Sequence, residues 1–279
     1  MRVATYNIQY WTGMDRIQDP GRTLKVLSEM EPDIVALQEV LHPWPPEEPA
    51  LEKAAQMLQG TFVFAEVWAV GDLPGISAPM GLAIISRYPI IAHATHRLTH
   101  SGPGQPRRLL EVRVELPDGT PFTVYATHLE WRSERPREEQ VRSLLLWTTR
   151  DRGRPHILLG DFNTVHPEDV RRFEEAGGRW LEFVAEVEEE FPQAPRDPRA
   201  LRPLLNVGYV DAFLAVGAGE GRTYTTERPL LRLDYCFVNP VLRSSLRTAR
   251  RWDTELARWA SDHYPVLVEL AWPFDNPVE

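Results

Sequence analysis

Residues suited to acid–base chemistry and to binding a hard metal ion lie at or just beyond the ends of several apolar runs. The most informative fragment is Gly160-Asp161-Phe162-Asn163, which follows the apolar run 156–159. Five further fragments of the same character are Thr5-Tyr6-Asn7-Ile8, Leu37-Gln38-Glu39-Val40, Ala126-Thr127-His128-Leu129, Arg232-Leu233-Asp234-Tyr235 and Ser261-Asp262-His263-Tyr264-Pro265. Because such runs predict buried strands, we expect these polar groups to converge at one edge of a sheet.

The carboxylate of Glu39 is a candidate ligand for a divalent metal ion. Magnesium prefers oxygen ligands, keeps several waters and often uses only one or two protein carboxylates. A carboxylate after the short apolar run 34–37 could instead cap the segment that follows it. The presence of Asn7, Asp161 and Asp262 in the other fragments favours a Mg²⁺ ligand, with Mn²⁺ as the alternative metal.

The Asp161 and Asn163 side chains could act together on a phosphate and a water molecule. Residues two apart in an extended segment point to the same side. One side chain can then orient or deprotonate a water while the other donates to a phosphate oxygen. Gly160 permits close approach of the backbone to a substrate. The structural alternative is an Asx-turn, in which such side chains bind their own backbone.

Two histidines lie within these fragments, His128 and His263. A histidine can donate to a phosphate or protonate a leaving oxygen near neutral pH. Asp234 is the natural partner to fix the tautomer of His263, although it could instead form a salt bridge with Arg232. The sequence has no phosphate-binding P-loop, no G-x-S-x-G elbow and no Cys/His zinc spacing. The groups that are present, carboxylates, amides and imidazoles with a hard metal ion, are suited to in-line attack of water on a phosphoester.

Length and composition predict one cytoplasmic domain spanning residues 1–279. No Gly/Ser/Pro-rich linker divides the chain, and its single cysteine, Cys236, excludes a disulfide framework and predicts a buried residue. The N-terminus lacks a signal-peptide pattern, and no apolar run predicts stable insertion in a membrane. The net charge of −9 argues against broad non-specific affinity for DNA, although a local basic rim or a bound metal can offset it. The oligomeric state stays open.

The hydrophobic pattern alternates strands with helices. We expect helices at 20–30, 51–58, from 136 and at 167–176, with strands at 2–8, 34–37, 61–69, 82–86, 90–98, 109–116, 122–127, into Asp161, 233–238 and 265–270. A hairpin turn at Pro117–Thr120 excludes a purely parallel sheet. This order fits an α+β fold in which helices pack outside two stacked, mostly antiparallel sheets. The acidic segment from Glu182 to Pro203 is typical of a solvated helix face.

The six fragments in this order make the chain resemble the endonuclease/exonuclease/phosphatase superfamily. This superfamily includes DNase I-like nucleases, abasic-site endonucleases, neutral sphingomyelinases and inositol-phosphate phosphatases. The resemblance runs from Thr5 to Leu270 and implies a four-layer α/β/β/α sandwich with the active site at one edge of the paired sheets.

The resemblance also implies a role for each matching residue. Asn7 and Glu39 would help hold the divalent metal, with Asp262 on the metal side. Asp161 would orient or deprotonate the water, and Asn163 would contact the scissile phosphate. The catalytic and phosphate-binding candidates are completed by His128, by His263 oriented by Asp234, and by Arg107 and Arg108 at a strand edge.

Two departures from the family pattern distinguish this chain from the abasic-site endonucleases. Those enzymes usually read Asn-x-Asp in the first motif, whereas this chain has Asn7-Ile8-Gln9. The neutral Gln9 weakens the case for a second metal site. His128 matches the histidine of the DNase I and sphingomyelinase branches instead.

These observations predict a divalent-metal-dependent phosphoesterase that hydrolyses a phosphodiester in the manner of a nuclease. The alternatives are a phosphomonoesterase, a phospholipid or sphingomyelin-type phosphodiesterase, and a catalytically inactive binding module on the same fold. The substrate could be nucleic acid, a lipid head group or a small metabolite. Four tryptophans form an aromatic rim for such a substrate or fill the core: Trp11, Trp44, Trp68 and Trp131.

Overall fold

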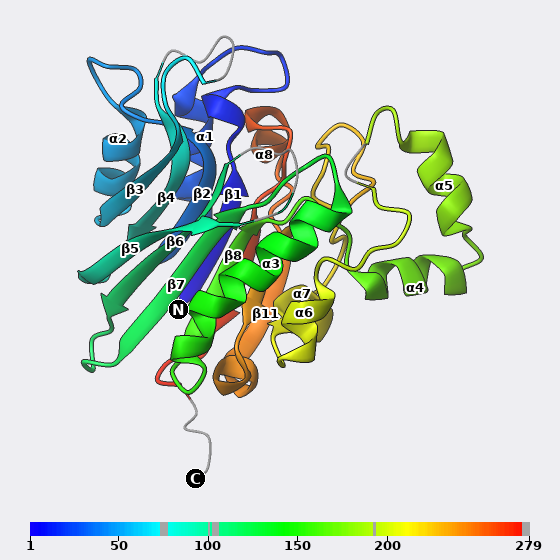
Figure 1. Ribbon diagram of the computed structural model, residues 1–279. Helices are drawn as coiled ribbons and strands as arrows, with labels where there is room; N and C mark the ends of the chain where they lie inside the picture. Colours follow the sequence, from blue (N-terminus) through cyan, green and yellow to red (C-terminus); the bar gives the residue numbers. More distant parts are fainter. Residues whose placement is uncertain (73–77, 100, 102–105, 192–193, 275–279) are drawn as a thin grey trace.

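Two mixed six-stranded sheets pack face to face, with helices on their outer sides (Figure 1). The computed structural model describes residues 1–72, 78–99, 101, 106–191 and 194–274. This arrangement confirms the α/β/β/α sandwich expected from the sequence, because each sheet buries one face against the other sheet and one against helices.

The first sheet has the strand order β11-β12-β1-β2-β4-β3. Its strands are β1 (Arg2–Asn7), β2 (Ile34–Leu41), β3 (Thr61–Trp68), β4 (Met80–Ser86), β11 (Leu246–Arg251) and β12 (Val266–Leu270). The pair β1–β2 is parallel, and the other neighbours are antiparallel. Helices α1 (Pro20–Met30), α2 (Ala50–Met57) and α8 (Glu255–Ala260) accompany this sheet (Figure 1).

The second sheet has the order β5-β6-β7-β8-β10-β9. Its strands are β5 (Ile90–Leu98), β6 (Arg107–Glu115), β7 (Pro121–His128), β8 (His156–Asp161), β9 (Val210–Asp211) and β10 (Asp234–Val238). Here β7–β8 is the parallel pair, and the other neighbours are antiparallel. Helices α3 (Glu134–Thr148) and α6 (Arg202–Asn206) pack on its outer face.

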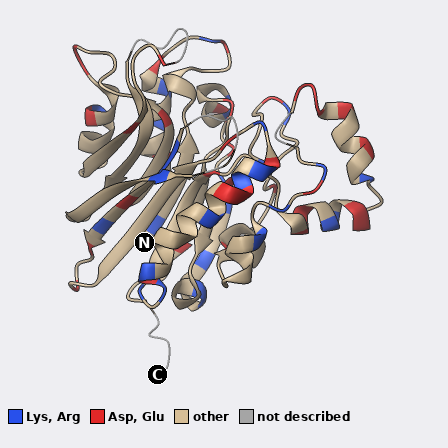
Figure 2. Cartoon of the chain, in the orientation of Figure 1, with Lys and Arg blue, Asp and Glu red and all other residues tan. Residues whose placement is uncertain are grey.

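The remaining helices are α4 (Pro167–Glu175), α5 (Trp180–Val187) and α7 (Ala212–Val216). Helices α4 and α5 project beyond the sheets and build a separate small core (Figure 1). Acidic side chains are frequent on both helices (Figure 2), and Glu186 and Glu188–Glu190 are exposed. The expected exposure of these acidic side chains is confirmed, but a single helix face is not, because α5 ends at Val187 and Glu188–Glu190 lie in the turn that follows it.

The main core lies between the two sheets and continues under the helices of the first sheet. It includes Ile84, Val112, Leu159 and Val268, all of which are fully buried. Burial of each such aliphatic side chain stabilises the fold by roughly 1.5–3 kcal/mol. Cys236 is also buried as a free thiol, as expected.

Local sequence signals explain the helix boundaries that the sequence predicted well. Helix α1 begins after Asp19, whose Oδ1 accepts a hydrogen bond from the Gly21 amide at 2.9 Å, and Pro20 occupies the first turn. Such an N-cap and an early proline favour helix initiation. The helix ends at Glu31 in a left-handed conformation. None of the described helices has the length and apolar character needed to cross a bilayer.

Candidate active site

The topology gathers the six sequence fragments at one edge of the sandwich. Parallel pairing of β1 with β2 and of β7 with β8 puts the carboxyl ends of these strands at a common edge of each sheet. Strand β10 runs the opposite way, so its first residue lies at that edge as well. In the ladder, His128 pairs with Asp161 and Asp161 pairs with Asp234. Asn7 ends β1, and Glu39 lies near the end of β2.

Asp161 lies at the centre of the cluster and is almost fully buried. Its Oδ2 accepts a hydrogen bond from Asn7 Nδ2 at 3.2 Å and lies 3.6 Å from His128 Nε2 and 3.7 Å from His263 Nε2. Burial raises the pKa of this carboxyl group to about 6. A carboxylate with such a pKa is suited to accept a proton near neutral pH.

The backbone after Asp161 forms the Asx-turn that the sequence allowed. The amide of Asn163 donates to Asp161 Oδ1 at 2.8 Å, and Asn163 adopts the left-handed conformation with φ of 52°. Asn163 Nδ2 donates to the Leu129 carbonyl at 3.0 Å. The turn uses only Oδ1 of Asp161, so Oδ2 remains directed at the two histidines.

His263 and Asp234 form a buried pair, with 2.8 Å between Nδ1 and Oδ2. Burial lowers the pKa of the His263 imidazole, but the charges of Asp234, Asp161 and Asp262 and the hydrogen bond to Asp234 together hold this pKa well above its usual value. The alternative prediction, a salt bridge between Asp234 and Arg232, is wrong, because Arg232 instead pairs with Asp169 and Asp211.

His128 has the opposite electrostatic environment. Burial, reinforced by the nearby charge of Arg107, lowers the pKa of its imidazole well below the usual value. The site thus holds a neutral imidazole and a protonated one on either side of the same carboxylate. Environments that drive the pKa values of two titratable groups apart are typical of divided acid–base roles.

Glu39 reaches the site through a local irregularity in its strand. The register between β2 and β4 shifts between Leu37 and Val40, and Glu39 has φ of 58°. Backbone strain of this kind in a non-glycine residue is common at functional sites. Glu39 Oε1 lies 4.0 Å from His128 Nε2, and the negative charge of Glu39 raises the pKa of the Tyr10 hydroxyl well above its usual value.

The donor set around Glu39 fits a hard divalent metal ion. Burial, followed by the negative charge of Asp262, raises the pKa of Glu39 to about 7, and burial also raises the pKa of Asp262. A cation bound between buried carboxylates stabilises their ionised forms. Asn7 contributes an amide, and Asp161 lies within hydrogen-bond distance of it. Glu39, Asp262 and Asn7 are therefore the residues that could hold Mg²⁺ or Mn²⁺, beside Asp161.

A second grouping, Asp161, Asp234 and His263, brings one potential ligand atom from each residue to within 4.8 Å of the others. Asp234 Oδ2 and His263 Nδ1 already bind each other. That pair therefore already fixes the orientation of the imidazole, whereas the carboxylates on the Glu39 side could hold a metal.

The two candidate arginines separate in space. Arg107 is almost fully buried with its guanidinium 5.0 Å from the centre of the Trp68 ring, and the charges of Glu39 and Asp161 act on it. Consecutive strand residues point to opposite faces, so Arg108 is directed away from the face that Arg107 occupies. Arg107 is therefore the candidate beside the carboxylates, and a phosphate contact by Arg108 stays a prediction.

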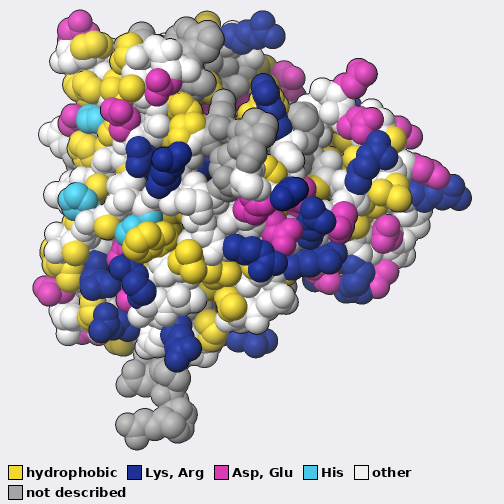
Figure 3. Space-filling model, in the orientation of Figure 1, with side chains coloured by type: hydrophobic (Ala, Val, Ile, Leu, Met, Phe, Trp, Pro, Cys, Tyr) yellow, Lys and Arg dark blue, Asp and Glu magenta, His cyan; other side chains and the backbone are white. Residues whose placement is uncertain are grey.

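The tryptophans do not form a continuous rim. Trp11 is fully buried and donates from Nε1 to the Leu41 carbonyl at 3.0 Å, and Trp68 is buried beneath Arg107. Both therefore fill the core. Trp44 and Trp131 are half-buried. On the face shown in Figure 3, basic and acidic side chains lie next to one another over α3 and the neighbouring loops.

Sequence reasoning missed several residues that support the site. Ser261 Oγ donates to the Asn7 carbonyl at 2.7 Å and accepts from the His263 amide at 3.3 Å, and its place directly before Asp262-His263 was an available signal. Tyr224 packs its ring 4.7 Å from that of His263. Nothing in the local sequence pattern points to Tyr224, because the contact depends on tertiary structure.

Comparison with known proteins agrees with the fold and with the family resemblance. The sequence model described as "Endonuclease/Exonuclease/phosphatase family" matches residues 4–263. The chain therefore belongs to the endonuclease/exonuclease/phosphatase family. Members of this family include phosphatases and nucleases, which is consistent with phosphoesterase activity. A search of curated proteins finds no significant match.

Solved structures share the fold at low sequence identity. An endonuclease/exonuclease/phosphatase from Beutenbergia cavernae is 24% identical with a TM-score of 0.71, covering 97% of this chain and 71% of that chain. A mannosyl-6-phosphatase from Bacteroides thetaiotaomicron is 19% identical with a TM-score of 0.66, covering 98% and 100%. The 3′ phosphatase NExo from Neisseria, bound to a product DNA hairpin, is 20% identical with a TM-score of 0.65, covering 98% and 100%.

Proposed function

We propose that this protein is a divalent-metal-dependent phosphodiesterase that hydrolyses its substrate by in-line attack of an activated water. The observation that carries the proposal is the position of Asp161, whose Oδ2 lies 3.6 Å and 3.7 Å from Nε2 of His128 and His263. Asp234 orients His263 from behind. Phosphoester hydrolysis requires a base for the water and groups that stabilise the phosphate charge. The site offers a buried base, two imidazoles of different charge and a neighbouring group of carboxylates.

Each residue has a distinct task in this reaction. Asp161 Oδ2 accepts a proton from the water while the water oxygen forms its bond to phosphorus. The bond from phosphorus to the leaving oxygen breaks on the opposite side, and that oxygen takes up a proton from solvent water. The His263 imidazolium donates a hydrogen bond to a phosphate oxygen and offsets the negative charge that develops there. Asn163 and Arg107 contact the remaining phosphate oxygens.

Glu39, Asn7 and Asp262 would hold the metal beside this group. A bound divalent ion supplies Lewis-acid stabilisation of the phosphate and neutralises the cluster of carboxylates. His128 is uncharged near neutral pH because of its lowered pKa. Its imidazole therefore contributes a hydrogen bond rather than a positive charge.

A phosphodiester is favoured over a monoester because His128 matches the histidine of the DNase I and sphingomyelinase branches. The structural neighbours include a mannosyl-6-phosphatase and a 3′ phosphatase, so a monoester remains the second candidate. An inactive binding module is disfavoured, because Glu39, Asp161 and His263 are all present and converge.

The test is hydrolysis of a panel of phosphoesters in Mg²⁺ and in Mn²⁺, with EDTA as the control. The panel comprises supercoiled plasmid, a single-stranded oligonucleotide with a 3′ phosphate, bis(nitrophenyl) phosphate, nitrophenyl phosphate and sphingomyelin vesicles. We expect metal-dependent cleavage of a diester. Cleavage of monoesters alone would replace the diester assignment, and no metal-dependent hydrolysis of any member would contradict the proposal.

A further inference from the structure

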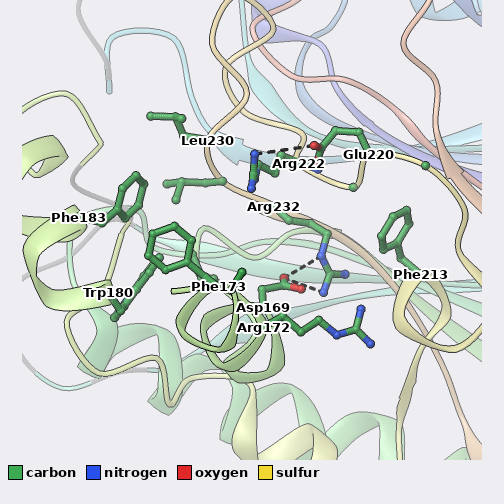
Figure 4. Close-up of a pocket in the computed structure, with 15 residues that line it drawn as sticks. Asp169, Arg172, Phe173, Trp180, Phe183, Phe213, Glu220, Arg222, Leu230 and Arg232 are labelled. Carbon is green, nitrogen blue, oxygen red and sulfur yellow. Dashed lines mark hydrogen bonds and ion pairs between the residues drawn. The ribbon is translucent and has the colours of Figure 1, made fainter. Parts of the chain in front are cut away.

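A cavity of about 430 Å³ lies outside the candidate active site, between α4, α5 and the segments 219–222 and 230–232 (Figure 4). None of the residues assigned to metal binding or catalysis lines it. Its volume falls in the range of small-molecule sites, which are mostly apolar with a few placed polar groups.

One wall of the cavity is aromatic. Phe173, Trp180 and Phe183 gather on one side in Figure 4, and their ring centres lie 5.3 to 6.0 Å apart. Leu230 extends this wall, and Phe213 lies across the cavity from it. Side chains of this kind offer an apolar surface on which a flat organic ring can stack.

The charges at the floor of the cavity are already paired within the chain. Arg232 is buried, and its Nη2 lies 2.8 Å from Asp169 Oδ2, while its Nη1 binds Asp211. A buried arginine held by two carboxylates does not require a ligand to satisfy it. The charged groups at the floor therefore need no ion from a ligand to neutralise them, and they form a fixed surface.

Two other arginines border the cavity and are half-exposed. Arg172 and Arg222 have 56% and 50% of their side chains exposed. Arg172 pairs with Glu168 through Nε at 3.2 Å, which leaves its two terminal nitrogens able to donate. Arg222 lies 3.7 Å from Glu220, too far for a strong hydrogen bond. Both guanidinium groups can turn to an anionic group on a ligand.

Part of the cavity wall belongs to the segment 224–231, which also contacts the candidate catalytic histidine, His263. Leu231 exchanges backbone hydrogen bonds with Tyr224, at 3.0 and 3.1 Å. The ring of Tyr224 in turn packs against the ring of His263. A molecule in the cavity would thus contact the segment that holds the active site without entering the site.

We propose that this cavity binds a small organic anion with an aromatic body, separate from the phosphoester substrate. The rings of the ligand would stack on Phe173, Trp180 and Phe183, and its anionic group would face Arg172 and Arg222. This inference is independent of the proposed function, because it needs neither a metal nor turnover.

The test is titration of the folded protein with anilinonaphthalene sulfonate, an anion with aromatic rings, followed by emission and calorimetry. Phenylnaphthylamine has the same rings without the sulfonate and serves as the matched neutral probe. We expect one saturable site for the anion. Arg172→Gln and Arg222→Gln should each weaken its binding about tenfold, the contribution of one charge-assisted hydrogen bond. Neither substitution should change binding of the neutral probe.

Arg171→Gln is the matched control, since Arg171 is an exposed neighbour on the same helix that does not line the cavity. Phe183→Ala should weaken both probes, and circular dichroism checks that each variant is folded. Anion binding that is unchanged in both arginine variants, or equally weakened by Arg171→Gln, would overturn the proposal. So would the absence of a saturable site in the unmodified protein.

Discussion

The imidazole of His263 is held by Asp234, with 2.8 Å between Nδ1 and Oδ2, so that Nε2 faces Asp161 at 3.7 Å. The pair crosses from the loop before β12 to the start of β10, and it therefore links the two sheets of the sandwich. Burial lowers the pKa of His263, but Asp234, together with the charges of Asp161 and Asp262, keeps it well above its usual value, which favours the protonated imidazole at neutral pH.

Asp234→Asn should shift the alkaline limb of the pH–rate profile to lower pH. The neutral amide removes the charge that favours the imidazolium, and burial then lowers the pKa of His263. The protonated form is present below this pKa, so activity in the variant should be lost as the pH rises through neutrality. We expect a shift of at least about one pH unit in kcat/KM. An unchanged alkaline limb would mean that the charge on His263 is not required.

The stability of the metal-free protein should fall as the pH rises from 5 to 8. The pKa of Glu39 is raised from 4.5 to about 7 in the folded state. Folding therefore favours its protonated form, and this stabilisation is lost as the pH rises through the folded-state pKa. The change in the free energy of unfolding from this group is up to about 3 kcal/mol.

Addition of Mg²⁺ should restore the lost stability at pH 8 and have little effect at pH 5. A divalent ion binds the ionised carboxylates, which are present only at the higher pH. The measurement is the Tm in EDTA and in Mg²⁺ at both pH values. An equal effect of Mg²⁺ at pH 5 and pH 8 would argue against a site made of these carboxylates.

Glu39→Gln should raise the Tm of the metal-free protein at pH 8, because it removes a buried charge that Asp262 repels. The same substitution should raise the Mg²⁺ concentration for half-maximal activity by about tenfold or more. Glu66→Gln, at an exposed position on β3, is the control. Unaltered metal dependence in the Glu39 variant would remove this residue from the metal site.

Gly160→Ala should lower the free energy of unfolding by at least about 2 kcal/mol. Gly160 has φ of +148°, and a Cβ there would lie 2.0 Å from the Thr127 carbonyl oxygen. Gly119→Ala provides the comparison, because Gly119 also has a positive φ but open space around it. Urea denaturation should show a smaller loss for Gly119→Ala. Equal losses would mean that the contact with β7 does not constrain Gly160.

The sequence was a good guide wherever a long periodic segment or a fixed motif was present. Helix α1 was predicted with its correct ends, because Asp19 and Pro20 mark its start. The strands that lead to Asn7 and Asp161 and the strand that begins near Asp234 were also predicted, and with them the edge at which these residues meet. The convergence of these distant fragments followed from their common position at strand ends.

The parts that the sequence did not predict depend on tertiary contacts. Strand β11 reads Leu-Arg-Thr-Ala-Arg-Arg and lies at a sheet edge, so it lacks the apolar run that identifies a buried strand. Helix α8 has six residues, too few to establish a helical period. The bulge at Glu39 and the packing of Tyr224 on His263 likewise arise from the assembled fold.

The most direct test of the central claim compares the protein with Asp161→Asn in nicking of supercoiled plasmid in Mg²⁺. The account predicts metal-dependent nicking that falls by about a thousandfold or more in the variant, because the amide cannot accept the proton of the attacking water. Asp118→Asn, in the exposed hairpin turn, should nick at the rate of the unmodified protein. Nicking by Asp161→Asn at that same rate would contradict the assignment of Asp161 as the centre of the active site.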